Sequence, residues 1–194
     1  MIALGFYYAM FGLSLLLVVI YAFIFHKRFD VNITLMCALV PVANLGFLVM
    51  GKAVDVHEAI IGLRMSYAGC FIMPIAMFLI FNICDIPLKR WMRVLIITFS
   101  TVVYASTLTI GYNNFFYKGL PTLVTEDGFS VLVDRHYGPM HTVFYVMVVL
   151  YYLLTAGAIV YSFIRKRQVP RSILILIVLA VTIAVFGFFG VNPQ

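Results

Sequence analysis

The residues best suited to chemistry in this chain form one polar stretch that leads into a long apolar run. In order, they are Asp55, His57, Glu58, Arg64, Ser66 and Tyr67. Ionisable groups within an apolar segment are expensive to place in lipid, so each is a candidate for function. Arg64 lies about 10 Å into the helix predicted to begin at Glu58. Its guanidinium can reach back to the lipid headgroups, or it can point inward and pair with Glu58 or an anionic ligand. Glu58 and Arg64 are not i,i+4 neighbours, and this spacing favours the headgroup interpretation.

Three histidines raise the question of a metal site. His57, His136 and His141 are all expected near one surface, with Asp134 and Glu58 close to them in sequence. Zinc favours such ligands. However, His136 and His141 are not at the spacing of a helical pair, and no cysteine joins them. Packing or hydrogen bonding is therefore the favoured role for these histidines, and we expect neither a metal nor another cofactor.

Motifs of catalysis are missing from the sequence. Every lysine falls at an end of an apolar run or between runs, so none is placed to form a retinal Schiff base. The chain has no Gly-rich phosphate loop, no HExxH and no GxSxG. Acids within the apolar runs are too few for a proton relay. Nothing in this segment supports an enzyme.

We expect a ligand site where the starts of two helices meet the loop between them. The residues expected to line it are Glu58, Arg64, Tyr67, Arg135, His136 and His141. A group of aromatic residues at the start of that loop comprises Tyr112, Phe115, Phe116 and Tyr117. These rings can form a belt at the membrane–water interface, or they can wall the ligand pocket.

The composition identifies the environment of these groups. Of the 194 residues, 64% are hydrophobic and 10% are charged, and the mean hydropathy is +1.10. Soluble domains carry about 25% charged residues, and a soluble fold of this size could not hide so much apolar surface. The net charge of +6 raises the possibility of nucleic-acid binding, but in a membrane protein basic residues set topology. We therefore expect the lipid bilayer, and no nucleic acid, as a partner.

Six segments are apolar enough to span a bilayer, which takes about 20 residues. They are residues 3–25, 33–50, 58–83, 94–110, 140–164 and 172–190. The first is too long for the apolar part of a signal peptide and lacks a basic stretch before it. The predicted fold is an all-α bundle of six transmembrane helices that forms a single domain over residues 1–194.

The distribution of charge predicts the orientation of the bundle. One set of short turns carries Lys27, Arg28, Lys89, Arg90, Arg93, Arg165, Lys166, Arg167 and Arg171, which are nine of the 13 Lys and Arg residues. Five of the seven acids lie on or near the opposite side. Positive charge collects in short cytoplasmic loops. The N-terminus is thus expected on the outer side of the membrane, and six crossings return the C-terminus to the same side.

One substantial loop, residues 111–139, is expected on the outer face. It contains two short β-favouring runs, 122–125 and 129–134, on either side of Asp127-Gly128. Asp-Gly between such runs is a strong hairpin signal. The sequence therefore predicts a small extracellular β-hairpin that caps the outer mouth of the bundle.

A proline interrupts the third apolar segment. Pro74 lacks an amide hydrogen, so we expect a kink there and a backbone carbonyl left without its helical partner. Such a kink can shape a cavity, or it can simply bend the helix.

Two stretches carry a resemblance to a known family. Residues 64–74 combine a polar start, a small-residue step and a proline near mid-helix, and Tyr137-Gly138-Pro139 follows the predicted hairpin and leads into the fifth helix. Together with the helix order and the single long outer loop, these features resemble the N-terminal seven-transmembrane sensor region of bacterial histidine kinases and related cyclic-di-GMP signalling proteins.

The resemblance implies a receptor module in a bacterial cell membrane that binds an unidentified small molecule and works as a homodimer. It also implies a seventh helix and a cytoplasmic output domain after residue 194, either a histidine kinase, a diguanylate cyclase or a cyclic-di-GMP phosphodiesterase. The chain is then expected to be a fragment. Two alternatives stay open: a small multi-pass transporter or channel, which needs a polar path across the membrane, and a structural subunit.

Overall fold

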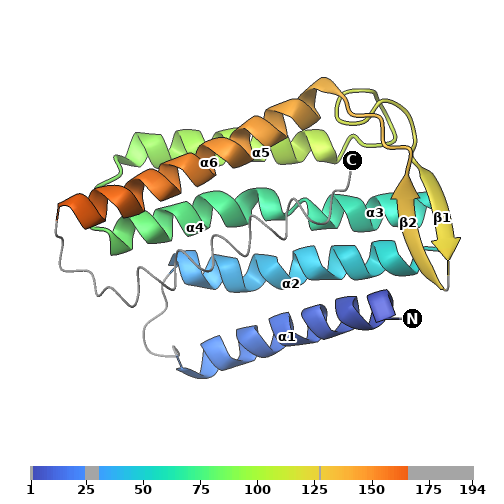
Figure 1. Cartoon of the computed structure of the whole chain (residues 1–194), viewed down its shortest axis with the longest axis horizontal. Coiled ribbons are helices and arrows are strands. Elements are labelled where there is room, and N and C mark those ends of the chain that lie inside the picture. Colours follow the sequence, from blue (N-terminus) through green and yellow to red (C-terminus); the bar gives the residue numbers. More distant parts are fainter. Residues whose placement is uncertain (1, 25–30, 127, 166–194) are drawn as a thin grey trace.

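The computed structural model describes residues 2–24, 31–126 and 128–165. Its helices lie side by side along one axis, and a two-stranded sheet covers one end of them (Figure 1). The elements are α1 (Ile2–Ile24), α2 (Val31–Lys52), α3 (Val56–Ser66), α4 (Gly69–Ile83), α5 (Arg90–Thr107), β1 (Thr122–Glu126), β2 (Phe129–Val133) and α6 (Pro139–Ile164). We call the end covered by the sheet the hairpin end.

Four stretches of the described residues are long and apolar enough to cross a membrane. They are Leu4–Phe23, Val31–Lys52, Val56–Ile83 and Pro139–Ile164, and they match four of the six predicted spans. The predicted span 94–110 is largely helical as α5, which begins earlier, at Arg90, and is not one of the four. The predicted span 172–190 lies outside the described residues. The membrane character of the chain is thus supported, while the count of six helices stays a prediction.

Helices α2 and α3 contact each other through their backbones. A Cβ atom added at Gly46 would lie 2.4 Å from Ser66 N and 2.6 Å from Gly62 O, and one added at Gly62 would lie 2.5 Å from Met50 N. Real Cβ atoms do not approach backbone so closely, so only glycine fits at both positions. Small residues commonly permit this kind of packing between helices in lipid, where no hydrophobic driving force brings helices together.

The third predicted span is two helices rather than one. Between α3 and α4, the chain makes a tight turn at Tyr67 and Ala68, with hydrogen bonds from Cys70 N to Tyr67 O (2.9 Å) and from Phe71 N to Ala68 O (3.1 Å). Bonds between residues three apart are those of a 3₁₀ turn. The turn lies before Pro74, which is inside α4, so the kink expected at Pro74 stays a prediction. A proline ring crowds the carbonyl four residues earlier, here that of Cys70, which follows the turn.

Helices α5 and α6 are joined by a buried polar contact. Ser100 Oγ lies 3.0 Å from the hydroxyl of Tyr151, which also donates to Ile96 O at 3.2 Å. Both side chains are at least 97% buried. A hydroxyl placed this deeply needs a partner within the protein, and each of these two supplies one for the other.

The predicted β-hairpin is confirmed as a structural element. Strands β1 and β2 pair antiparallel from Thr122↔Val133 to Glu126↔Phe129, which leaves a two-residue connection. Gly128, the second residue of that connection, has a φ of +74°. A tight hairpin turn requires positive φ, and glycine adopts it without steric cost.

Strand β2 packs onto the ends of α1 and α2. The ring of Phe129 stacks on that of Tyr7 with centroids 5.6 Å apart and planes 11° apart. Ser130 Oγ donates to Ala53 O at 2.7 Å. The hairpin therefore holds together the beginning of α1 and the residue that follows α2 (Figure 1).

The glycine contact gives a test of the α2–α3 packing. Gly62→Ala forces backbone atoms apart and is expected to destabilise the protein by about 1–3 kcal/mol. Gly157 of α6 has nothing within 4 Å of an added Cβ, so Gly157→Ala is expected to be neutral or to stabilise by about 0.5–1 kcal/mol. Thermal unfolding in detergent, followed by circular dichroism, measures both. A Gly62→Ala protein as stable as the wild type would contradict the packing.

Candidate functional site

An aromatic cluster fills the hairpin end of the bundle. Its members are Tyr67, Phe116, Tyr117, Tyr137, His141, Phe144 and Tyr145, each within 6.3 Å of another ring centroid. They come from the α3–α4 turn, from the loop before β1, from the segment after β2 and from the first turns of α6. The aromatic cluster thus joins segments that are far apart in the sequence.

His141 lies near the centre of this cluster. Its ring stacks on Tyr137 with centroids 3.8 Å and planes 10° apart, and it meets the edge of Tyr145 at 4.8 Å. Only 4% of the residue is exposed. Gly138 and Pro139 start α6 just before it, and proline suits the first helical position because no amide hydrogen is needed there.

A hydrogen bond joins the helix break to the loop. The hydroxyls of Tyr67 and Tyr117 lie 2.9 Å apart, and the ring of Tyr67 meets the edges of Phe116 at 5.0 Å and Phe144 at 5.3 Å. Burial raises the pKa of Tyr117 above its ordinary value of 10.0, an effect that the nearby charge of Arg135 partly offsets. Tyr117 is therefore a neutral phenol at physiological pH, able to donate and accept.

Backbone hydrogen bonds fix the loop beneath the cluster. Lys118 N donates to His136 O at 2.7 Å, and Gly138 N donates to Phe116 O at 2.8 Å. A Cβ atom on Gly138 would lie 2.5 Å from Phe115 O, so the close approach of the two segments requires glycine. These contacts set the position of Tyr117 relative to α6.

Arg64 links α3 to the end of α5. One of its Nη atoms donates to Ile110 O, just beyond α5, and its guanidinium carbon lies 5.0 Å from the ring centroid of Tyr112. Cations are favourable near the carbonyl end of a helix and over an aromatic face. Its Nε is buried without a hydrogen-bond partner in the described part of the chain. The sequence left open whether Arg64 reaches the headgroups or pairs with Glu58 or an anionic ligand. In the structure, Arg64 binds the backbone of the loop after α5.

Arg135 lies at the edge of the aromatic cluster. Its Nε donates to Leu132 O at 2.9 Å, and its charge interacts with Tyr67, Tyr117 and His141. The residue is half-buried. Arg135 therefore places a positive charge where solvent and the aromatic cluster meet.

The other two predicted lining residues are engaged differently. The carboxylate of Glu58 accepts from Val54 N at 2.9 Å, while Glu58 N donates to Asp55 Oδ1 at 2.8 Å. This reciprocal arrangement caps the start of α3. The side chain of His136 is exposed, and its backbone carbonyl accepts the hydrogen bond from Lys118 N. Of the six predicted residues, the structure places Tyr67, His141 and Arg135 at the cluster, Arg64 beside the loop after α5, Glu58 in a helix cap and His136 on the surface.

The four loop aromatics differ in burial, while the choice between an interfacial belt and a pocket wall stays a prediction. Phe116 and Tyr117 are at most 1% exposed and belong to the core, whereas Tyr112 and Phe115 are 81% and 54% exposed. Within residues 2–24, 31–126 and 128–165, no group of three His, Cys, Asp or Glu side chains could hold a metal ion.

Sequence reasoning missed Tyr137 and Tyr145 as members of the site. Tyr145 follows His141 by four residues, so the two face the same side of α6, and this spacing could have indicated it. Tyr137 reaches His141 through the turn at Gly138, which no local pattern in the sequence specifies.

A family model described as the N-terminal 7TM region of histidine kinase matches residues 7–191. No curated protein and no solved structure matches the chain.

The Tyr67–Tyr117 contact can be measured by a double-mutant cycle. Tyr67→Phe and Tyr117→Phe each remove the same hydrogen bond, so the double variant is expected to lose less stability than the sum of the two, with a coupling of about 0.5–1.5 kcal/mol. Chemical denaturation in detergent gives the free energies. The control pairs Tyr67→Phe with Tyr137→Phe and is expected to be additive. Additivity in the first cycle would disprove the bond.

Proposed function

The chain belongs to the family of N-terminal seven-transmembrane regions of histidine kinases, and on that premise we propose that it is a receptor whose ligand acts at the aromatic cluster. This region is the non-catalytic, membrane-embedded sensor part of such proteins. In the proposal, a small molecule binds at the hairpin end and controls an output domain on the cytoplasmic side. A histidine kinase is the output that the family description favours; a cyclic-di-GMP enzyme stays an untested alternative.

One observation carries the proposal: the aromatic cluster joins the loop between α5 and β1 to the turn between α3 and α4. Tyr67 lies in the turn between α3 and α4 and binds Tyr117 of the loop. Tyr137 is 45% exposed and Arg135 is half-buried, so a ligand can reach the rim of the cluster from solvent. The backbone hydrogen bonds of Gly138 and of the loop hold the rim against the start of α6.

The signal follows from differential binding. A ligand shifts a protein between two states only if it binds one state better. In the proposal, the turn at Tyr67 and Ala68 is the element that takes two arrangements, because the regular hydrogen bonding of α3 ends there and that of α4 begins. A ligand that favours one arrangement of Tyr117 and His141 changes the direction of α4 or α6, and both helices run to the opposite end of the bundle (Figure 1).

The proposal includes an orientation. The hairpin end faces outward, the N-terminus lies outside, and α5 crosses the membrane with the others. The described cations at the opposite end, Lys89, Arg90, Arg93 and Arg165, agree with a cytoplasmic location for that end.

Cysteine labelling tests this orientation and the crossing of α5. Tyr112 and Lys89 are exposed and lie beyond opposite ends of α5. With a membrane-impermeant maleimide, Tyr112→Cys is expected to label in intact bacteria, and Lys89→Cys only after permeabilisation. The parent chain, whose Cys37, Cys70 and Cys84 are buried, is the unlabelled control. Labelling of both variants in intact cells would mean that α5 does not cross.

Kinase activity tests the signalling role. In membranes that contain the full-length kinase, Tyr67→Phe is expected to change the basal level of autophosphorylation by about fivefold or more, the range of ordinary coupling energies. Arg64→Ala is expected to do the same, because it releases the end of α5 from α3. The control, Tyr161→Phe, makes the same chemical change on an exposed residue at the far end of α6.

The result must be read beside protein level and thermal stability in the same membranes. Unchanged autophosphorylation in folded Tyr67→Phe and Arg64→Ala proteins would refute the proposal that the cluster transmits a signal.

A further inference from the structure

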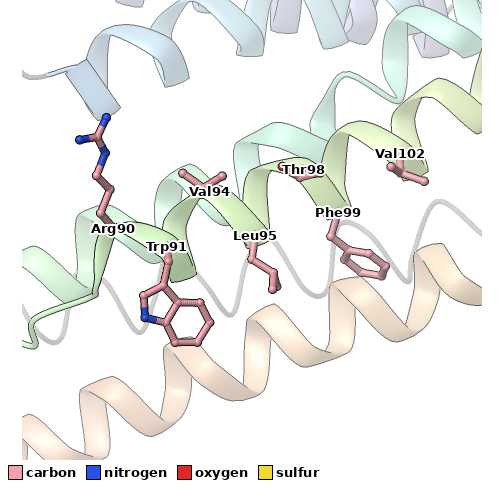
Figure 2. Close-up of a pocket in the computed structure, with 7 residues that line it drawn as sticks. All are labelled: Arg90, Trp91, Val94, Leu95, Thr98, Phe99 and Val102. Atoms are coloured by element: carbon pink, nitrogen blue, oxygen red, sulfur yellow. The ribbon is translucent and has the colours of Figure 1, made fainter.

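A groove runs along the outward face of α5. Seven residues line it, all from this helix: Arg90, Trp91, Val94, Leu95, Thr98, Phe99 and Val102 (Figure 2). They form two rows at i,i+4 spacing. One row is Arg90, Val94, Thr98 and Val102, and the other is Trp91, Leu95 and Phe99. Rows of this kind are the ridges of a helix surface, and the space between them is a groove.

The two ends of this groove differ in chemistry. Arg90 and Trp91 lie in the first turn of α5, and the lining beyond them is apolar apart from Thr98. Trp91 is 61% exposed and Leu95 is 60% exposed, so these surfaces are open within the described structure. From Trp91 to Val102 the groove is about 17 Å long, which is close to half of a hydrocarbon core of about 30 Å. Its apolar part therefore matches one lipid leaflet.

The charged end of the groove carries an excess of cations. Lys89 and Arg90 are exposed. Arg93 is turned away toward α4, where it donates to Asn82 Oδ1 at 3.2 Å and lies 6.0 Å from the ring centroid of Phe78. Arg165, at the end of α6, lies at the same end of the bundle (Figure 1). Against these cations, the described residues of that end contain one acid, Asp85.

We propose that the α5 groove binds an anionic phospholipid. Its acidic headgroup pairs with Arg90, Trp91 lies at the level of the interface, and one acyl chain lies between the two rows toward Val102. Basic sites next to membrane helices recognise acidic headgroups in this way, and tryptophan favours the interface. The exposed charge of Arg90, the only charged side chain in the lining, selects an acidic lipid over a zwitterionic one. The inference needs α5 to lie in the membrane, as proposed above, but it is independent of any ligand at the aromatic cluster.

Trp91 is the only tryptophan of the chain, so its fluorescence reports on this groove alone. The protein is placed in vesicles of phosphatidylcholine and phosphatidylglycerol in which one lipid at a time carries brominated acyl chains. At equal mole fraction, brominated phosphatidylglycerol is expected to quench Trp91 with an apparent affinity about fivefold higher than brominated phosphatidylcholine, the preference that one basic residue near a membrane surface provides.

Two variants decide the origin of any preference. Arg90→Gln removes the exposed cation of the groove and is expected to abolish the preference while leaving quenching in place. Lys118→Gln removes an exposed cation near the hairpin end and is expected to leave the preference unchanged.

The remaining outcomes overturn the proposal. Equal quenching by the two lipids in the wild type would reduce the groove to ordinary lipid contact. A preference that survives Arg90→Gln would place the selectivity elsewhere. Quenching by neither lipid would mean that another part of the chain, a second copy or water covers Trp91, so that the groove is closed to lipid. None of these results bears on autophosphorylation, so the receptor proposal stands or falls separately.

Discussion

The structure depends on one constraint: a polar group placed in hydrocarbon has no water to bind and must find its partner in the chain. Several hydroxyl side chains obey it by bonding within their own helix, as Ser106 does to Val103 O and Thr155 to Tyr151 O. The buried hydroxyl of Tyr152 is an exception within the described residues. The turn between α3 and α4 obeys it through short-range backbone bonds. Arg64 follows the same rule in part: one of its Nη atoms donates to Ile110 O, just beyond α5, while its buried Nε has no hydrogen-bond partner in the described residues. The break in the spanning element can exist because its exposed backbone groups are satisfied locally.

Sequence reasoning succeeded where a property is local. The length of an apolar run predicts a spanning helix, and four of the six runs are helices of the required kind. The hairpin followed from Asp127-Gly128, because the demand for positive φ at a tight turn is met by the glycine at that position. The start of α5 was predicted four residues late, since apolar character begins at Val94 while the helix itself already includes Arg90 and Arg93.

Contacts between distant residues could not be predicted in this way. Tyr67 and Tyr117 are 50 residues apart in sequence, and no local sequence pattern around either residue indicates the other as its partner. Glu58 was expected at a ligand site because it is charged. In the structure it caps the start of its own helix, a role that the spacing from Asp55 to Glu58 indicates. The turn at Tyr67 and Ala68 was not expected, because the residue that the sequence marks as irregular is Pro74, and Pro74 lies inside α4. The residue types thus indicated the correct region of the chain, but the partner that each residue contacts could be identified only from the fold.

The turn at Tyr67 and Ala68 has a mechanical consequence. Helix α3 is held against α2 by close backbone contact at Gly62, whereas a Cβ atom added at Gly69, the first residue of α4, would meet nothing within 4 Å. Because α4 also packs against α2, α5 and α6, a change in its direction at the turn has to move those contacts as well. Over the 15 residues of α4, about 22 Å long, a tilt of about 5° moves the tip by about 2 Å. Displacements of this size are enough to repack a helix interface.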